Sequence, residues 1–174
     1  MATKCIIVMG TCGSGKTSVG LALAEHFGCR FIDGDDLHPR ANVEKMASGH
    51  PLNDADRAPW LTRINDVVFS LKNRSASGII VCSALKKIYR DQIRFGNDGG
   101  VAFIHLYGSY ELILERMRKR SGHYMKEAMV KSQFDTLEFP GADEPDVINI
   151  DVTPPLDEVI AASIRAAEEL GING

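Results

Sequence analysis

The sequence has no long hydrophobic run, and each of its other scarcities excludes a class of protein. No segment approaches the ~18 consecutive apolar residues of a membrane span, so we expect no interaction with a membrane. A net charge of −3 and an isoelectric point near 5.9 argue against a general nucleic-acid binder. The apolar run at the N-terminus is too short for the core of a signal peptide, and a cytoplasmic location is the expectation.

Cysteine is also scarce. The four cysteines, Cys5, Cys12, Cys29 and Cys82, form no Cys-x-x-Cys pair and have no neighbouring histidines at zinc spacing. Scattered thiols of this kind suit a reducing compartment, and they predict no structural metal site.

The rest of the composition is that of an ordinary globular protein, with 44% hydrophobic and 25% charged residues. The chain has no internal repeat, low-complexity tract or linker rich in proline and serine. Its 174 residues have room for one core, and about 70% of the unfolded surface would be buried on folding. The sequence therefore predicts one domain over residues 1–174.

Short apolar runs alternate with longer amphipathic stretches, which is the pattern of an α/β protein with a parallel sheet. The predicted strands are Cys5–Met9, Phe31–Ile32, Ile79–Cys82, Val101–Leu106 and Val147–Ile150. The predicted helices span about residues 15–27, 54–72, 85–95, 109–120, 126–137 and 155–170. Gly28, Gly78 and Gly171 stand where helices are expected to end.

A glycine-rich segment joins the first predicted strand to the first predicted helix. Residues 10–17 read Gly-Thr-Cys-Gly-Ser-Gly-Lys-Thr, a complete Gly-x4-Gly-Lys-Thr phosphate loop. Glycine lets several backbone N–H groups converge on one anion, and the helix N-terminus behind the loop adds favourable dipole charge. Lys16 is then expected to reach the β- and γ-phosphates, and Thr17 to bind Mg²⁺.

A dinucleotide-binding fingerprint fits this segment less well, because Ser18 stands where glycine or alanine is required. The predicted ligand is therefore a nucleoside triphosphate. Its predicted binding residues in this segment are Gly10, Thr11, Cys12, Gly13, Ser14, Gly15, Lys16, Thr17 and Ser18.

Three carboxylates follow the second predicted strand, in the segment Asp33-Gly34-Asp35-Asp36. In an open parallel sheet the ligand lies beyond the carboxyl ends of the strands, so these groups could hold Mg²⁺ through water and accept a hydroxyl proton. The third predicted strand ends without an aspartate, which leaves Asp33 to position the metal ion. The alternative is a solvated aspartate-rich turn.

The polar segment over about residues 36–62 is too long for a bare connection, and we predict that it recognises the second substrate. Arg57 could offer a two-pronged contact to a carboxylate. The structural alternative is a helix capped by Asn53 or Asp54 with Trp60 packed inward, and both descriptions can hold together. A lone histidine such as His38 is more often structural.

Two further basic groups allow a functional and a structural interpretation. Lys86, at the start of a predicted helix, could hold an anionic or polyhydroxy substrate, or it could belong with Lys87 and Arg90 to a solvated helix face. Arg116 and Arg120 are four residues apart on one helix face and could neutralise a triphosphate, although basic residues are favoured at any helix C-terminus. The Ser121-Gly122 pair that follows would permit a lid to move.

With these segments in hand, the chain resembles the gluconokinases, small P-loop kinases akin to shikimate kinase and the nucleoside monophosphate kinases. The resemblance covers nearly the whole length and is far more specific than the phosphate loop alone. It rests on residues 33–39 (DGDDLHP), 45–49 (KMASG), 51–60 (PLNDADRAPW) and 82–86 (CSALK), with Gly122-His123 and Gln133-Phe134.

This resemblance implies ATP- and Mg²⁺-dependent phosphorylation of the 6-hydroxyl of D-gluconate, which gives 6-phospho-D-gluconate and ADP. It also implies a three-layer α/β/α fold, a five-stranded parallel sheet in the order 2-3-1-4-5, a helical lid over about residues 121–138 and a homodimer. Arg116 would stack on adenine with the loop near Pro154 on its other face. Lys16, Asp35 and Arg120 would be catalytic, with Asp33 in the Mg²⁺ shell and Asp35 at the acceptor hydroxyl. The substrate-binding residues would be Asp35, His38, Lys45, Arg57, Lys86 and His123.

The residues are also compatible with two alternatives: a kinase of another small acceptor, such as shikimate or a nucleoside monophosphate, and an ATP-sensing module without catalysis. The lack of an Asn-Lys-x-Asp segment argues against a GTPase. The phosphate loop departs from the family's common Gly-Val-Ser-Gly-Ser-Gly-Lys by having Thr11-Cys12. The thiol suggests the hypothesis that oxidation or alkylation of Cys12 blocks ATP binding.

Overall fold

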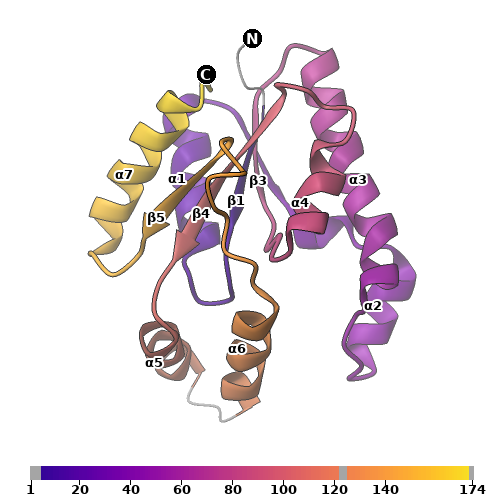
Figure 1. Ribbon diagram of the computed structural model, residues 1–174, viewed down its shortest axis with the longest axis vertical. Helices are drawn as coiled ribbons and strands as arrows, with labels where there is room; N and C mark the ends of the chain where they lie inside the picture. The colour runs from indigo at the N-terminus through magenta and orange to yellow at the C-terminus, as the bar shows by residue number, and fades with distance from the viewer. Residues whose placement is uncertain (1–4, 122–124, 173–174) are drawn as a thin grey trace.

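Five parallel strands form the sheet at the centre of the computed structural model, which describes residues 5–121 and 125–172 (Figure 1). The strands are β1 (Cys5–Met9), β2 (Arg30–Asp33), β3 (Gly78–Val81), β4 (Val101–Tyr107) and β5 (Val147–Asp151). Their order is β2-β3-β1-β4-β5, and every neighbouring pair is parallel. The predicted strand order is confirmed.

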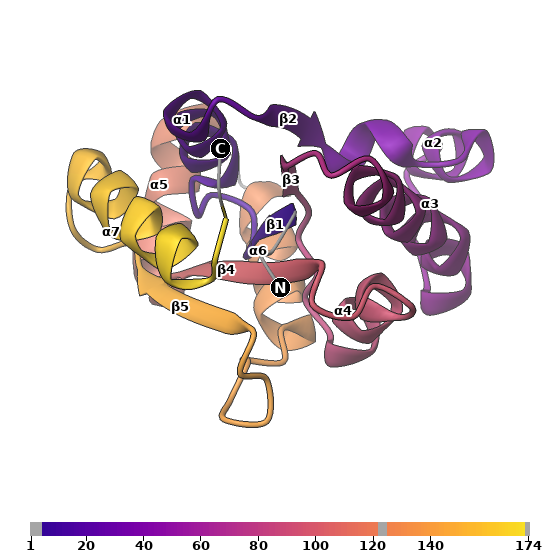
Figure 2. The ribbon, with the colours of Figure 1, turned by 90° about the horizontal axis from the view of Figure 1, so that it is seen from above.

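Helices cover both faces of the sheet, which gives the three layers that were predicted. The α-helices are α1 (Lys16–Phe27), α2 (Arg40–Ala47), α3 (Asp54–Asn73), α4 (Lys87–Arg94), α5 (Tyr110–Ser121), α6 (Met125–Thr136) and α7 (Leu156–Glu169). A short 3₁₀ helix, η1 (Gly34–Leu37), follows β2. Figure 2 shows α1 and α7 on one side of the sheet and α3 and α4 on the other. Helices α5 and α6 lie beyond its lower edge in Figure 1.

The core consists of two layers, one on each side of the sheet. In β1, Ile6 and Val8 point to the α1 and α7 side, whereas Cys5, Ile7 and Met9 point to the α3 and α4 side. All five side chains are fully buried. A parallel strand covered on both faces is a continuous apolar run rather than an alternating one, which is why β1 could be recognised from sequence. Across residues 5–121 and 125–172, none of the helices is long and apolar enough to cross a bilayer.

Of the predicted helix ends at Gly28 and Gly78, the structure confirms the first and contradicts the second. Gly28 caps α1 in the left-handed conformation, with φ of 63°. The prediction for Gly78 is wrong, because α3 ends earlier, at Asn73, and Gly78 is the buried first residue of β3. A Cβ at Gly78 would lie 2.7 Å from a Leu71 methyl carbon, so glycine is needed there for close packing rather than for a cap.

Helix α3 is capped by Asn53, as the structural alternative for this segment predicted. The Asn53 side chain accepts a hydrogen bond from the N–H of Asp56, whose carboxylate accepts one from the N–H of Asn53, a reciprocal capping box. Helix α2 was not predicted. Its apolar side chains Val43 and Met46 are half exposed, so no buried stripe marks this helix in the sequence.

Candidate active site

The loop between β1 and α1 has the backbone of a phosphate cradle. Gly10, Gly13 and Gly15 have φ of 147°, 77° and 92°, values that side-chain-bearing residues rarely adopt. A Cβ at Gly10 would also lie 2.5 Å from the carbonyl oxygen of Leu106. Inside the loop, the Ser14 hydroxyl donates a 2.7 Å hydrogen bond to the carbonyl of Thr11, which holds the turn closed.

Lys16 is the first residue of α1, and its ammonium folds back over the loop. Its Nζ donates a 2.8 Å hydrogen bond to the carbonyl oxygen of Thr11. Burial lowers the pKa of this ammonium, while the nearby negative groups, Asp35 and Asp33 among them, act in the opposite direction. Thr17 and Ser18 follow on the first turn with exposed side chains. The predicted nucleotide-binding groups of residues 10–18 are therefore brought together at one helix N-terminus.

The two aspartates with predicted roles lie at the end of β2. Asp33 caps η1, with its Oδ1 accepting a 3.0 Å hydrogen bond from the N–H of Asp35. A Cβ at Gly34 would lie 2.5 Å from the carbonyl oxygen of Val81, so this glycine lets η1 pack against β3. Burial and the charge of Asp33 raise the pKa of Asp35. Asp35 is thus a carboxylate that holds a proton more readily than an ordinary aspartate.

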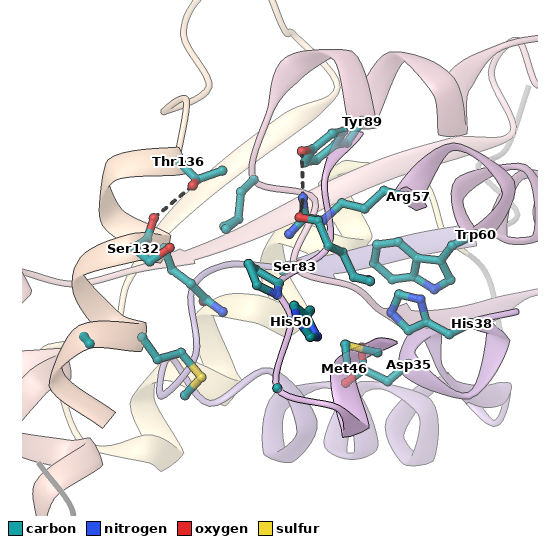
Figure 3. A pocket seen from close by; sticks show the side chains of 17 residues that line it. Asp35, His38, Met46, His50, Arg57, Trp60, Ser83, Tyr89, Ser132 and Thr136 are labelled. Atoms are coloured by element: carbon teal, nitrogen blue, oxygen red, sulfur yellow. Dashed lines mark hydrogen bonds between the residues drawn. The ribbon is translucent and has the colours of Figure 1, made fainter. Parts of the chain in front are cut away.

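A cavity of about 640 Å³ opens beside η1, and we call it the acceptor cavity (Figure 3). It is lined from η1, α2, the segment before α3, α3 itself, the loop after β3, α4 and α6. Three predicted substrate residues line it: Asp35, His38 and Arg57. Other polar residues that line it were not predicted as site residues: His50, Ser83, Tyr89, Ser132, Gln133 and Thr136. They come from distant segments, and sequence pattern alone could not place them together.

One wall of the cavity is a stacked pair of rings. His38 lies parallel to Trp60, with ring centroids 4.2 Å apart and planes 14° from parallel. The Trp60 indole donates a 2.7 Å hydrogen bond to the carbonyl of Gly34, and the His38 ring contacts the Asn42 amide at 3.2 Å. Burial lowers the pKa of His38, so a neutral imidazole is favoured. Trp60 is buried, as the structural alternative for this segment required.

At the other end of the cavity, Arg57 and Tyr89 are in contact. Arg57 Nη1 donates to the carbonyl of Leu52 at 2.9 Å and to the Tyr89 hydroxyl at 3.3 Å (Figure 3). Lys86 lies nearby and donates to both carboxylate oxygens of Asp54 at 3.2 Å, and the Tyr89 hydroxyl donates to the same carboxylate. These groups line a second, adjoining opening of about 530 Å³.

Other predicted residues lie apart from the acceptor cavity or outside the described chain. Lys45 forms a 2.6 Å ion pair with Asp56, the residue that completes the α3 cap, and is not among the residues that line the cavity. Arg120 is exposed near the end of α5. His123 lies outside the described residues, so its predicted role stays a prediction.

Arg116 lies close to the loop after β5. Its Nη2 donates a 2.7 Å hydrogen bond to the carbonyl of Val152, two residues before Pro154. The structure thus brings Arg116 to the segment that contains Pro154, and the role of both residues at adenine stays a prediction.

Arg90 is not part of a solvated helix face, so that structural alternative is wrong for this residue. Its guanidinium is fully buried and donates to both carboxylate oxygens of Glu144, at 2.7 and 2.8 Å. It also donates to the carbonyl oxygens of Ala84 and Leu85. Ala84 has a φ of 45°, unusual for a residue with a side chain. Arg90 therefore holds the loop that carries Ser83 into the cavity.

Comparison with known proteins agrees with this arrangement. A family model described as an AAA domain matches residues 6–136. The thermoresistant gluconokinase of Escherichia coli K12 is 47% identical over 163 residues, which cover 94% of this chain and 93% of the relative. The thermosensitive gluconokinase of the same strain is 52% identical over 152 residues, 87% of this chain and 81% of that protein.

Solved structures show the same relationship. A gluconokinase from Sinorhizobium meliloti 1021 superposes with a TM-score of 0.84 at 43% identity, over 95% of this chain and 92% of that one. A shikimate kinase from Aquifex aeolicus shares the fold alone, with a TM-score of 0.56 and 16% identity over 98% of this chain and 99% of that one. Sequence identity, coverage and fold lead to one conclusion: the chain belongs to the gluconokinase family.

Proposed function

We propose that the protein transfers the γ-phosphoryl group of ATP to the 6-hydroxyl of D-gluconate, yielding 6-phospho-D-gluconate and ADP. The observation that carries this proposal is the acceptor cavity, which has a carboxylate, Asp35, near the ammonium of Lys16 and a guanidinium, Arg57, further away. An acceptor with a hydroxyl at one end and a carboxylate at the other matches this cavity, because the hydroxyl can face Asp35 and the carboxylate can face Arg57. Shikimate and the nucleoside monophosphates are the competing acceptors.

The phosphate loop and Lys16 would hold the β- and γ-phosphates, and Arg120 would neutralise charge as the phosphoryl group moves. Arg116 and Pro154 would enclose the adenine. Residues 121–138 would act as the lid, because α6 already contributes part of the cavity wall.

The donor groups of Thr17 and Asp33 suit Mg²⁺. A hydroxyl at the N-terminus of α1 and a carboxylate at the end of β2 are hard oxygen ligands, and the Asp33 carboxylate lies in the electrostatic environment of Lys16. We propose that Thr17 binds the ion and that Asp33 orients its water shell. When bound, Mg²⁺ would neutralise charge on the phosphates.

Asp35 would accept the proton of the 6-hydroxyl as it attacks, because it lines the cavity and lies near Lys16. The segment of residues 36–62 would hold the sugar acid, with Arg57 at the carboxylate and the neutral His38 ring bonding a hydroxyl. Lys86, paired with Asp54, would border the anionic end of the acceptor, and Lys45 would act through Asp56. Alignment and electrostatics then supply most of the rate.

An acceptor panel tests the proposal. Purified protein with ATP and Mg²⁺ should release ADP with D-gluconate and form 6-phospho-D-gluconate, detected by mass spectrometry. ADP release with shikimate or a nucleoside monophosphate in place of gluconate would assign another acceptor. ATP binding without acceptor-dependent ADP release would indicate a sensing module instead.

Two finer points belong to the same proposal. We propose a homodimer, which light scattering on the purified protein would test. A cytoplasmic location completes the proposal, and fractionation of cells that express the protein would test it.

A further inference from the structure

Asp54, Arg57, Lys86 and Tyr89 form one connected group at the mouth of the acceptor cavity, and we call it the outer cluster. Arg57 and Tyr89 line both the cavity and the adjoining opening, whereas Asp54 and Lys86 line the opening alone. Asp54 and Arg57 come from the first turn of α3, and Lys86 and Tyr89 come from the start of α4. The packing of α3 against α4 therefore decides which charges meet here.

One cation of the outer cluster is compensated within the protein. Lys86 Nζ is 3.2 Å from each carboxylate oxygen of Asp54, and the Tyr89 hydroxyl donates to Asp54 as well. These contacts lower the pKa of Asp54, and Asp54 in turn raises the pKa of Lys86, so both groups stay charged near neutral pH. The pair contributes no net charge to the cluster.

The other cation, Arg57, has no carboxylate in direct contact within the described part of the chain, although the charges of Asp54 and Asp56 act on it from further away. Arg57 bonds two neutral oxygens through Nη1, the carbonyl of Leu52 and the hydroxyl of Tyr89. Within residues 5–121 and 125–172, no carboxylate forms an ion pair with its guanidinium. Its remaining N–H groups are held in a fixed plane, since Leu52 and Tyr89 fix one side of the fork. The outer cluster thus has one unpaired positive charge.

Given the proposed function, we infer that Asp54 is a specificity-determining residue, oriented by the Tyr89 hydroxyl, and that it restricts the acceptor to one with a single negative charge at its anionic end. One carboxylate matches the Arg57 fork. A doubly charged group brings a second charge that finds no cation, because Asp54 holds Lys86, and it also meets the like charge of Asp54. Repulsion as well as attraction therefore sets the choice of substrate.

Three acceptors that share the free 6-hydroxyl and the gluco configuration test this inference: D-gluconamide, D-gluconate and D-glucitol 1-phosphate. The groups that they have at carbon 1, an amide, a carboxylate and a phosphate ester, have charges of 0, about −1 and about −2 near pH 8. The parent protein should prefer gluconate by kcat/KM. Asp54→Asn should raise the kcat/KM for glucitol 1-phosphate relative to gluconate by about tenfold, because Lys86 is released and the like charge is removed.

Matched variants separate this effect from general changes in charge or stability. Asp66→Asn removes the same charge from an exposed position on α3 and should leave the acceptor ratio unchanged. The double variant Asp54→Asn with Lys86→Gln should lose most of the gain, because the released cation is gone and only the removal of the like charge remains. Tyr89→Phe keeps the ring and should shift the ratio in the same direction as Asp54→Asn by a smaller factor, which gives a second test if Asp54→Asn folds poorly.

The outcomes are distinguishable. An unchanged acceptor ratio in folded Asp54→Asn, or an undiminished gain in the double variant, overturns the inference while gluconate turnover by the parent still supports the proposed function. If the parent protein phosphorylates none of the three acceptors, the proposed function fails and the inference fails with it.

Discussion

The side-chain oxygen of Gln133 accepts a 2.6 Å hydrogen bond from the backbone N–H of Cys12. The two residues are 121 positions apart in the chain, and the bond joins α6 directly to the phosphate loop. Gln133 also lines the acceptor cavity. One side chain therefore contacts both halves of the site, which makes it a direct route by which the acceptor can influence the nucleotide.

Substitution of Gln133 should separate this contact from charge. Gln133→Ala removes the bond, so hydrogen exchange in α6 should accelerate and the KM values for both substrates should rise several-fold. Gln133→Glu keeps an acceptor for the Cys12 N–H but places a negative charge beside the triphosphate, so α6 should exchange as in the parent while the KM for ATP rises about tenfold. Lys131→Gln changes the net charge of α6 by the same amount as Gln133→Glu, but at an exposed position. It should neither accelerate hydrogen exchange in α6 nor raise the KM for ATP. Equal exchange behaviour in the two Gln133 variants would contradict this account.

Lys16→Ala should abolish most turnover without loss of the fold. The ammonium lies over the phosphate loop, and removal of one charge-stabilising contact typically costs about 10²–10³ in kcat. The measurement is ADP release with gluconate, with circular dichroism and a thermal melt to confirm the fold. Near-parental turnover by a folded Lys16→Ala protein would remove Lys16 from the mechanism.

The pH dependence of the rate should report Asp35. As the proposed base, Asp35 must be ionised, and burial together with the charge of Asp33 raises its pKa. The kcat/KM for gluconate should therefore fall as the pH is lowered through a value above that of an ordinary aspartate. Asp36→Asn removes another negative charge that raises this pKa, so the acid limb should move to lower pH. An acid limb that stays in place, or that also moves in Asp66→Asn, would argue against Asp35.

The free energy of unfolding should fall in acid because two buried groups, His105 and Glu144, take up protons over different pH ranges. His105 is buried, and burial lowers its pKa to about 4 even though it bonds Asn149 at 2.7 Å. The unfolded chain takes up this proton near pH 6.5, so the free energy of unfolding should fall as the pH drops from about 6.5 to about 4. His105→Gln should flatten this part of the stability curve, measured by urea unfolding at each pH.

Glu144 governs how the free energy of unfolding changes at still lower pH. Burial opposes its ionisation, but hydrogen bonds from Arg90 and Arg94 outweigh burial and hold its pKa at about 2. Its contribution is complete above about pH 4.5 and is lost as the pH falls toward 2. Glu144→Gln should lower the free energy of unfolding at pH 7 by about 3 kcal/mol, because it leaves a buried guanidinium uncompensated. Glu115→Gln, from an exposed ion pair with Lys119, should change stability little.

Alkylation tests the hypothesis for Cys12. Burial raises the pKa values of Cys5, Cys29 and Cys82, so these thiols should react slowly. Iodoacetamide should abolish ATP binding by the parent, and Cys12→Ser should resist, because bulk at Cys12 would crowd the phosphates. Full ATP affinity in protein shown by mass spectrometry to be modified at Cys12 would refute the hypothesis.

Local sequence was sufficient for much of the fold. The β1 run and the glycines after it are local features, since an apolar strand buried on both faces and a loop with positive φ at Gly13 and Gly15 each follow from a few consecutive residues. The strand order came from resemblance to a family rather than from pattern. Helix α2 was missed because it buries little apolar surface.

The order of the residues is enough to specify the phosphate loop, the alternation of strands and helices, and the residue types available for chemistry. Which charges are compensated depends on how the helices and loops pack. Arg57, Lys86 and Arg90 are all basic in the sequence, yet among the described residues Arg57 bonds only neutral oxygens at the cavity, Lys86 is paired with Asp54, and Arg90 is buried against Glu144. The physical reason is that charge interactions depend on distance and burial, and these are set where α3, α4 and the segment before β5 meet in space.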